Sequence, residues 1–224
     1  LDHVVNGVIT GIFCHLGQIC VAGSRLLVHE SQHDELLERI IAKAQSLKQG
    51  DPTDPEMHLG CLATPTHCDF VRSRVEQAKQ EGARLVLSGD ISDDPLDCFY
   101  PPTIFDQVSP DMAVAKEEVF GPVLSVMTFK TEEEAIRIAN DSDFGLMANI
   151  WSTDGTRALR VARELQAGRI SINGGGYLRP NVPIYGYKKS GFGAELGFIE
   201  AAHEFCNSKS VIYSLATEKS PWPE

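Results

Sequence analysis

The chain carries the stretch Gly17-Gln18-Ile19-Cys20-Val21-Ala22-Gly23-Ser24-Arg25, in which a cysteine lies between two glycines. Apolar residues at helical spacing precede it over residues 1–16, and the apolar run Leu26-Leu27-Val28 follows it. We therefore expect a helix that ends near Gly17, then a tight connection and a buried strand. Cys20 would lie on that connection, where backbone N–H groups can point at the atom that a thiolate attacks.

Two roles are open to Cys20 on this basis. A cysteine in a folded protein commonly serves as a small hydrophobic side chain. A nucleophilic cysteine reacts as the thiolate, so it needs a lowered pKa or a nearby base. One cysteine by itself favours the first role, and the second role depends on what the rest of the chain carries.

The composition narrows the classes of protein to which the chain can belong. Hydrophobic residues make up 42% and charged residues 23% of the 224 residues, which is typical of soluble globular proteins. The net charge of −11 argues against a nucleic acid or an anionic membrane as partner. Residues 3–24 carry no Lys, Arg, Asp or Glu, but glycines interrupt this run and its apolar positions keep a helical period. We therefore expect no membrane span.

Six cysteines are spread over the chain without a Cys-x-x-Cys pair: Cys14, Cys20, Cys61, Cys68, Cys98 and Cys206. This spacing matches neither a zinc framework nor a small secreted disulfide scaffold. Cys14 and His15 lie near Cys20, but their spacing fits no usual set of ligands, so we expect no metal site. A reduced, cytoplasmic setting is the simplest interpretation.

Helical patterns alternate with apolar, strand-like runs along the chain. Helix starts are indicated by a capping pattern at residues 31–34, by Thr64-Pro65 and by Thr131. Strands are expected over residues 26–28, 84–87, 99–108, 123–129, 146–151 and 169–173. Pro101-Pro102 should keep its strand out of a central ladder position. The alternation predicts an α/β fold with a largely parallel sheet flanked by helices, and residues 210–215 read as a strand that protrudes from the domain body.

A second motif is Glu117-Glu118-Val119-Phe120-Gly121-Pro122-Val123. A carboxylate beside a glycine-proline turn can accept hydrogen bonds from a diol such as a ribose, and an aromatic ring two residues later can pack against a flat ring. The alternative is a solvated acidic pair followed by a core phenylalanine. The motif alone favours that alternative, so its interpretation also depends on the rest of the chain.

Both motifs resemble segments of the aldehyde dehydrogenase superfamily. Gly-Gln-x-Cys-x-Ala-Gly-Ser-Arg resembles the family's nucleophile segment, and Glu-Glu-x-Phe-Gly-Pro-Val resembles its cofactor segment. Residues 186–197 resemble the family's Gly-Tyr-Lys-x-Ser-Gly-x-Gly-Arg-Glu-x-Gly segment, with Ala194 in place of the arginine. Asn173, before a glycine-rich stretch, resembles a strand-end asparagine near the family's substrate pocket.

The resemblance implies oxidation of an aldehyde to a carboxylic acid with NAD or NADP as cofactor. It makes Cys20 the nucleophile, which forms a thiohemiacetal and then a thioester. Glu118 would bind the nicotinamide ribose, and Phe120 would lie beside the nicotinamide. Ile19, Val21 and Ile184 would belong to the substrate pocket; Ile184 stands where the family often has an aromatic residue, so the substrate class does not carry over.

The resemblance also implies a domain organisation. Residues 1–190 would form the catalytic domain, and residues 191–224 a return segment with an oligomerisation strand that makes a homodimer or a homotetramer. The chain would correspond to the C-terminal half of such an enzyme. The family's general-base glutamate, oxyanion-hole asparagine and remaining cofactor contacts would then precede residue 1.

Two other functions stay open. A family member that acylates coenzyme A would transfer the acyl group to CoA rather than to water. A non-catalytic fragment would keep the fold without the chemistry. Detection of acyl-CoA separates the first from an acid-forming enzyme, and the length of the complete gene bears on the second.

Overall fold

Strand β4 (Val123–Phe129) lies at the centre of the main sheet in the computed structural model, which describes residues 1–91, 97–174, 179–213 and 215. The sheet has the strand order β1-β4-β3-β2. β4 runs parallel to β1 (Arg25–His29) and to β3 (Thr103–Asp106), whereas β2 (Arg84–Leu87) is antiparallel to β3. The first five residues of β4 are all buried, as expected for a strand covered on both faces. The predicted α/β fold with a largely parallel sheet is confirmed.

The position of β3 differs from the prediction. We expected Pro101-Pro102 to keep this strand out of a central ladder position, but β3 lies between β4 and β2. The reason is that β3 begins at Thr103, after both prolines. The missing N–H groups of the prolines therefore cost the ladder no hydrogen bond.

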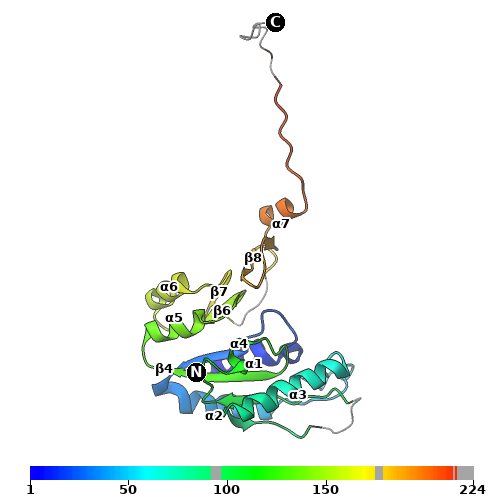
Figure 1. Ribbon diagram of the computed structural model, residues 1–224, viewed down its shortest axis with the longest axis vertical. Coiled ribbons are helices and arrows are strands. Elements are labelled where there is room, and N and C mark those ends of the chain that lie inside the picture. Colours follow the sequence, from blue (N-terminus) through cyan, green and yellow to red (C-terminus); the bar gives the residue numbers. More distant parts are fainter. Residues whose placement is uncertain (92–96, 175–178, 214, 216–224) are drawn as a thin grey trace.

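Helices flank this sheet, as Figure 1 shows: α1 (Asp2–Phe13), α2 (His33–Gln45), α3 (Pro65–Gln80) and the short α4 (Ala113–Lys116). Within this layer α1 contacts α2, and α3 contacts α4. Ile12, Ile40, Val71 and Leu124 come from three helices and the central strand, and each is at most 1% exposed. The sheet and its helices thus share one apolar core.

Among the described α-helices, three begin with a side-chain cap, which satisfies a backbone N–H that the helix itself leaves without a partner. The hydroxyls of Thr64 and Thr131 accept hydrogen bonds from the third residue of α3 and of α5 (Glu132–Asn140). The carboxylate of Asp154 does the same for α6 (Gly155–Glu164). The predicted capping pattern at residues 31–34 is wrong. Ser31 lies in a 3-10 turn (Glu30–Gln32), where its backbone N–H donates to the ring of His29, and α2 begins only at His33.

Beyond α5 the described residues form short strands that pair two by two. β6 (Met147–Ile150) is parallel to β7 (Arg169–Ile172), as the sequence indicated. The sequence did not indicate the two antiparallel pairs, which are β5 (Phe144–Gly145) with β9 (Tyr187–Lys188) and β8 (Ile184–Tyr185) with β10 (Ala194–Glu195).

The chain leaves the body after α7 (Ile199–Glu204) as an extended arm, which Figure 1 shows in orange and red. The predicted departure from the body is thus present. The predicted strand over residues 210–215 is not formed by its described residues, 210–213 and 215. A strand needs a neighbouring edge for its hydrogen bonds, and the arm extends away from the sheets of this chain. None of the helices in the described ranges is long and apolar enough to cross a membrane.

Candidate active site

Cys20 lies on a turn between α1 and β1, as the sequence predicted. α1 ends at Phe13, and the next residues include His15, Leu16 and Gly17 with left-handed φ values of 51°, 55° and 69°. The N–H of Ala22 donates to the carbonyl of Ile19 across the turn, at 2.9 Å. The Cys20 side chain is exposed, whereas Ile19 and Val21 on either side are half-buried. The thiol is therefore presented to solvent on a backbone that its neighbours hold.

Gln18 fixes the segment just before the cysteine. Its Oε1 accepts a hydrogen bond from the backbone N–H of Ala63 at 2.8 Å. Its Nε2 lies 3.2 Å from the carbonyl oxygen of His15 and 3.5 Å from that of Cys61. One side chain thus ties the Cys20 loop (residues 14–24) to the segment that leads into α3.

The second motif forms a tight turn (residues 117–122), called the Glu118 turn below. Glu118 is exposed, whereas Val119 is buried in the core, with 4% of its surface exposed. Phe120 adopts a left-handed φ of 53° and is 38% exposed. Such a conformation costs a non-glycine residue about 1 to 3 kcal/mol, so surrounding contacts must hold it.

The Cys20 loop and the Glu118 turn meet at two glycines. A Cβ atom on Gly17 would lie 2.2 Å from the carbonyl oxygen of Gly121 and 3.1 Å from that of Ile12. No side chain fits in that space, so the two backbones approach more closely than any other residue at position 17 would allow. The structure therefore places the two motifs side by side, although they lie far apart in the sequence.

Helix α3 lies against the Glu118 turn through residues that belong to neither sequence motif. His67 Nε2 is 2.7 Å from the carbonyl oxygen of Phe120, and Arg74 forms an ion pair with Glu117 at 2.9 Å. A Cβ atom on Gly121 would lie 2.8 Å from a methyl carbon of Val71. His67 and Arg74 are seven residues apart on one helix, and this spacing is the signal that could have indicated a shared face.

Asn173 is bound at both ends of its amide. Its Nδ2 donates to the carbonyl of Ser152 at 2.7 Å, and its Oδ1 accepts from the Ser152 backbone N–H at 2.9 Å. The ring of His3 lies 3.2 Å from the carbonyl oxygen of Asn173, close to the ring of Trp151. The side chain therefore joins the ends of β6 and β7 beside the start of α1, the helix that leads to Cys20.

The residues assigned to a substrate pocket come from two parts of the chain. Ile19 and Val21 flank Cys20 in its turn. Ile184 is 9% exposed and lies on β8, which pairs with β10 outside the four-stranded sheet. A shared pocket of these three residues therefore stays a prediction.

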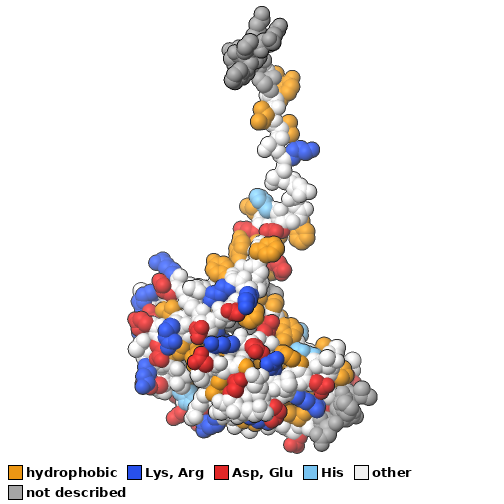
Figure 2. Space-filling view, viewed as in Figure 1, with side chains coloured by type: hydrophobic (Ala, Val, Ile, Leu, Met, Phe, Trp, Pro, Cys, Tyr) orange, Lys and Arg blue, Asp and Glu red, His pale blue; other side chains and the backbone are white. Residues whose placement is uncertain are grey.

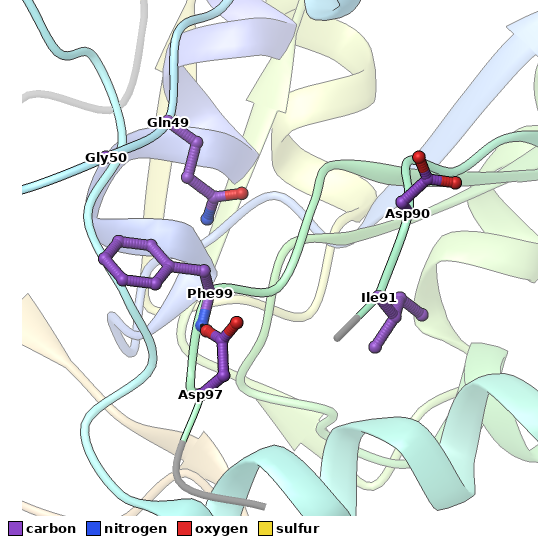
Figure 3. A pocket seen from close by; sticks show the side chains of 6 residues that line it. All are labelled: Gln49, Gly50, Asp90, Ile91, Asp97 and Phe99. Atoms are coloured by element: carbon purple, nitrogen blue, oxygen red, sulfur yellow. The ribbon is translucent and has the colours of Figure 1, made fainter. Parts of the chain in front are cut away.

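Two hollows of the described surface lie outside both motifs. One of about 420 Å³ has Gln49, Gly50 and Phe99 on one side and Asp90 and Ile91 on the other, as Figure 3 shows. A second, of about 410 Å³, lies between α2 and β2. The residues that line them belong to neither motif, so these open hollows do not mark the site. In the described ranges, no group of three or more His, Cys, Asp or Glu side chains is arranged to hold a metal ion.

A buried carboxylate at the end of β3 links the sheet to α2. Asp106 is 0% exposed and bonds to His33 at 2.8 Å and to Arg84. Burial by itself would raise the pKa of Asp106, but the hydrogen bonds from Arg84 and His33 outweigh it and hold the pKa below its ordinary value. Burial likewise would lower the pKa of His33, and the bonds to Asp106 and Asp34 raise it instead. The cluster is structural and lies outside both motifs.

Comparison with known proteins assigns the chain to a class. The profile of the Aldehyde dehydrogenase family matches residues 1–211. The chain belongs to this family, as its two sequence motifs indicated.

Particular relatives resemble the chain over nearly all of its length. It is 39% identical over 222 residues to a betaine aldehyde dehydrogenase of Cereibacter sphaeroides, which covers 99% of this chain and 46% of the relative. It is 40% identical over 211 residues to succinate-semialdehyde dehydrogenase [NADP(+)] 1 of Mycobacterium tuberculosis, covering 94% of this chain and 46% of the relative. The chain thus spans about half the length of the curated relatives that it matches.

Solved structures show the same fold. A NAD-dependent aldehyde dehydrogenase from Sinorhizobium meliloti has a TM-score of 0.93 at 40% identity, covering 99% of this chain and 44% of that one. A betaine aldehyde dehydrogenase from Staphylococcus aureus in complex with NAD+ also has a TM-score of 0.93, at 35% identity, covering 100% of this chain and 45% of that one.

Proposed function

We propose that the protein containing this chain oxidises an aldehyde to a carboxylic acid with NAD or NADP. The observation that carries the proposal is the close approach of Gly17 to Gly121, which sets the loop that carries the exposed Cys20 against the Glu118 turn. A nucleophile and a binding site for a hydride acceptor must lie next to each other for this reaction. The family membership and the names of the relatives support the same activity.

The two motifs fit a nicotinamide cofactor chemically. The Glu118 carboxylate is exposed and can accept hydrogen bonds from both hydroxyls of a ribose. The Phe120 ring, partly exposed on the same turn, offers an apolar face to a flat ring. When bound, the cofactor supplies the acceptor for the hydride that leaves the substrate carbon.

Cys20 carries the covalent part of the proposed reaction. Its thiolate adds to the aldehyde carbon while the carbonyl electrons move to oxygen, and the backbone N–H of Cys20 is a donor for that oxyanion. Loss of hydride from the same carbon re-forms the carbonyl as a thioester. Water then adds to the thioester, the C–S bond breaks, and the acid and the thiolate are released. By resemblance, a glutamate outside these 224 residues removes the proton from that water.

The alternatives carry less support. The names of the relatives, a betaine aldehyde dehydrogenase and a succinate-semialdehyde dehydrogenase, do not favour transfer of the acyl group to CoA. A non-catalytic fragment remains the expectation if these residues are made without the rest of the enzyme. Ile19 and Val21 support a substrate pocket at Cys20, whereas Ile184 needs its own test.

We also infer a homodimer or homotetramer held by the arm. Val211, Ile212, Tyr213 and Leu215 are each at least 80% exposed, and Figure 2 shows apolar side chains on the outer part of the described arm. An extended apolar segment is a template for pairing with another chain, and symmetric pairing is how soluble proteins commonly use one. The division at residue 190 and the cytoplasmic location remain predictions; six free cysteines support a reduced compartment.

A labelling experiment tests the roles of Cys20 and Glu118 in the longest natural chain that contains these residues. Limiting iodoacetamide should label Cys20 before the other exposed thiols, Cys14, Cys61 and Cys206. Cys20→Ser should abolish acid formation. Glu118→Gln should keep normal labelling of Cys20 but lower turnover about tenfold or more, because the ribose loses a charged acceptor. Preferential labelling of another thiol, or unchanged turnover in Cys20→Ser, would overturn the proposal.

A further inference from the structure

One face of α3 lies along the Glu118 turn. His67, Phe70, Val71 and Arg74 follow the i, i+3, i+4, i+7 spacing of a single helical stripe. Contacts from this stripe reach three residues of the turn: Arg74 pairs with Glu117, His67 bonds to the carbonyl of Phe120, and Val71 lies against Gly121. The helix thus holds the turn on both sides of Glu118.

His67 is built into this contact. A carbonyl oxygen can only accept, so the Nε2–H of His67 is the donor in the 2.7 Å bond to Phe120. Its ring stacks on Phe70, with centroids 5.9 Å apart, and meets the Phe120 ring edge-on at 6.1 Å. Its backbone N–H donates to the Thr64 cap. The imidazole therefore has a fixed orientation from which it holds the left-handed backbone of Phe120.

The segment that leads into α3 holds the other motif. Gln18 bonds to the backbone of Ala63 and Cys61, four and six residues before His67. Residues 61–67 are therefore fastened to the Cys20 loop at one end and to the Glu118 turn at the other. Both connections are made by side-chain amide or imidazole groups that take no part in the proposed chemistry.

We propose that His67 and Gln18 are positioning residues, which use residues 61–67 as a common brace to set the cofactor turn and the thiol relative to each other. This inference rests on the proposed function. His67 acts on the cofactor, because it fixes the backbone that carries Glu118 and Phe120. Gln18 acts on the nucleophile, because it fixes the backbone two residues before Cys20. The two roles therefore separate experimentally.

The test uses four variants of the longest natural chain that contains these residues. His67→Leu keeps bulk but removes the donor, and His67→Gln restores an N–H donor. Gln18→Leu removes both hydrogen-bonding atoms of that side chain. Gln80→Ala, at the exposed end of the same helix, is the matched control. Two readouts need no turnover: the dissociation constant of NADH from fluorescence titration, and the rate of Cys20 alkylation by iodoacetamide.

His67→Leu should weaken NADH binding about tenfold and leave the alkylation rate of Cys20 within about twofold of the parent, because one hydrogen bond to the turn is lost. His67→Gln should recover most of the binding. Gln18→Leu should slow alkylation of Cys20 about tenfold and leave NADH binding within about twofold, because the thiol loop alone is released. Gln80→Ala should match the parent in both readouts.

The inference is overturned if His67→Leu and Gln18→Leu behave like Gln80→Ala, or if each lowers both readouts equally, as a general loss of structure would. A parent protein that oxidises aldehydes while these variants behave like the control separates this failure from failure of the proposed function. A parent that binds no NADH and forms no acid overturns both.

Discussion

The part of the chain up to α5 buries most of its apolar side chains, whereas the part beyond α5 exposes many of them. Nearly all buried hydrophobic residues lie between Val5 and Ile138, and beyond them only Ala158 and Ile184 of the described residues are buried hydrophobics. The later part instead exposes large apolar side chains, among them Phe192 at 101%, Phe205 at 90% and Ile212 at 94%. The first part encloses its own core, whereas the second leaves large apolar side chains exposed, the kind of surface at which a partner contact is expected.

The difference follows from the number of strands in each sheet. β4 has a neighbour on each side, and helices cover the four-stranded sheet, so its apolar residues are buried on both faces. The later strands pair only two by two in the described residues, and such pairs are marginal without further cover. Stability should therefore respond strongly to substitutions in the first part and weakly to substitutions in the arm.

Gly17→Ala should have the largest effect on the first part. The new Cβ would meet the carbonyl oxygen of Gly121, and φ at this position is 69°, so strain and overlap add to a loss of about 4 kcal/mol. Gly82→Ala is the matched control, because φ is 96° there but nothing lies within 4 Å of the new Cβ. It should cost about 1 to 2 kcal/mol. Urea denaturation measures both, and equal losses would show that the two motifs do not need this approach.

Asp106→Asn should come next, with a loss of about 3 kcal/mol, because it leaves His33 and Arg84 without their buried carboxylate. The folding stability of the parent protein should also depend on pH. The lowered pKa of Asp106 gives stability that is present above its ordinary value of 3.8 and lost as pH falls through the folded pKa. The raised pKa of His33 gives stability that is present below 6.5 and lost as pH rises through the folded pKa.

Thermal melts across this range check the pH dependence of Asp106→Asn. The contribution of the cluster should be greatest between the two ordinary pKa values and should flatten in the variant. A variant that melts like the parent at every pH would show that the cluster contributes nothing to folding.

Substitutions in the arm should have the smallest effect on folding. Val211→Ser and Ile212→Ser change side chains that are 81% and 94% exposed, so the free energy of unfolding of one chain should change by less than about 0.5 kcal/mol. Sedimentation should nevertheless show a loss of oligomer, because these side chains form the proposed contact with another copy. Lys209→Ser, in the same arm, serves as the control. If the oligomer is unchanged in all three variants, the arm does not form the proposed contact with another copy.

Local chemistry explains what could be predicted from the sequence. Thr64 and Thr131 predict the starts of their helices, because a cap needs only a hydrogen bond to the residue three positions later. Ser31 has a similar pattern, yet His29 takes its backbone N–H. β8, β9 and β10 are two residues each, too short for any period to appear.

In the candidate site, too, local features could be predicted from the sequence and long-range ones could not. The glycine-flanked turn at Cys20 could be predicted, because apolar periodicity fixes where the helix ends and the strand begins. The left-handed conformation of Phe120 could not be predicted, since an aromatic residue has no intrinsic preference for it. The residues that hold this turn are distant in the sequence: His67 contacts Phe120, and Gly17 approaches Gly121. The residues around Gly17 and Gly121 in the sequence do not indicate that the two glycines approach each other either.

The pairing of β1 with β4 has a consequence for the order of events during synthesis. In the described sheet β1 has β4 as its neighbour, and Arg25 stands opposite Ser125. The strand that follows Cys20 therefore has no partner strand while the intervening residues are translated, which takes on the order of 5 to 20 s at ribosomal speed. During that interval the Cys20 thiol lies on a segment of the nascent chain whose strand is not yet paired. Chaperones or small-molecule thiols in the cell can therefore reach the thiol before β1 pairs with β4.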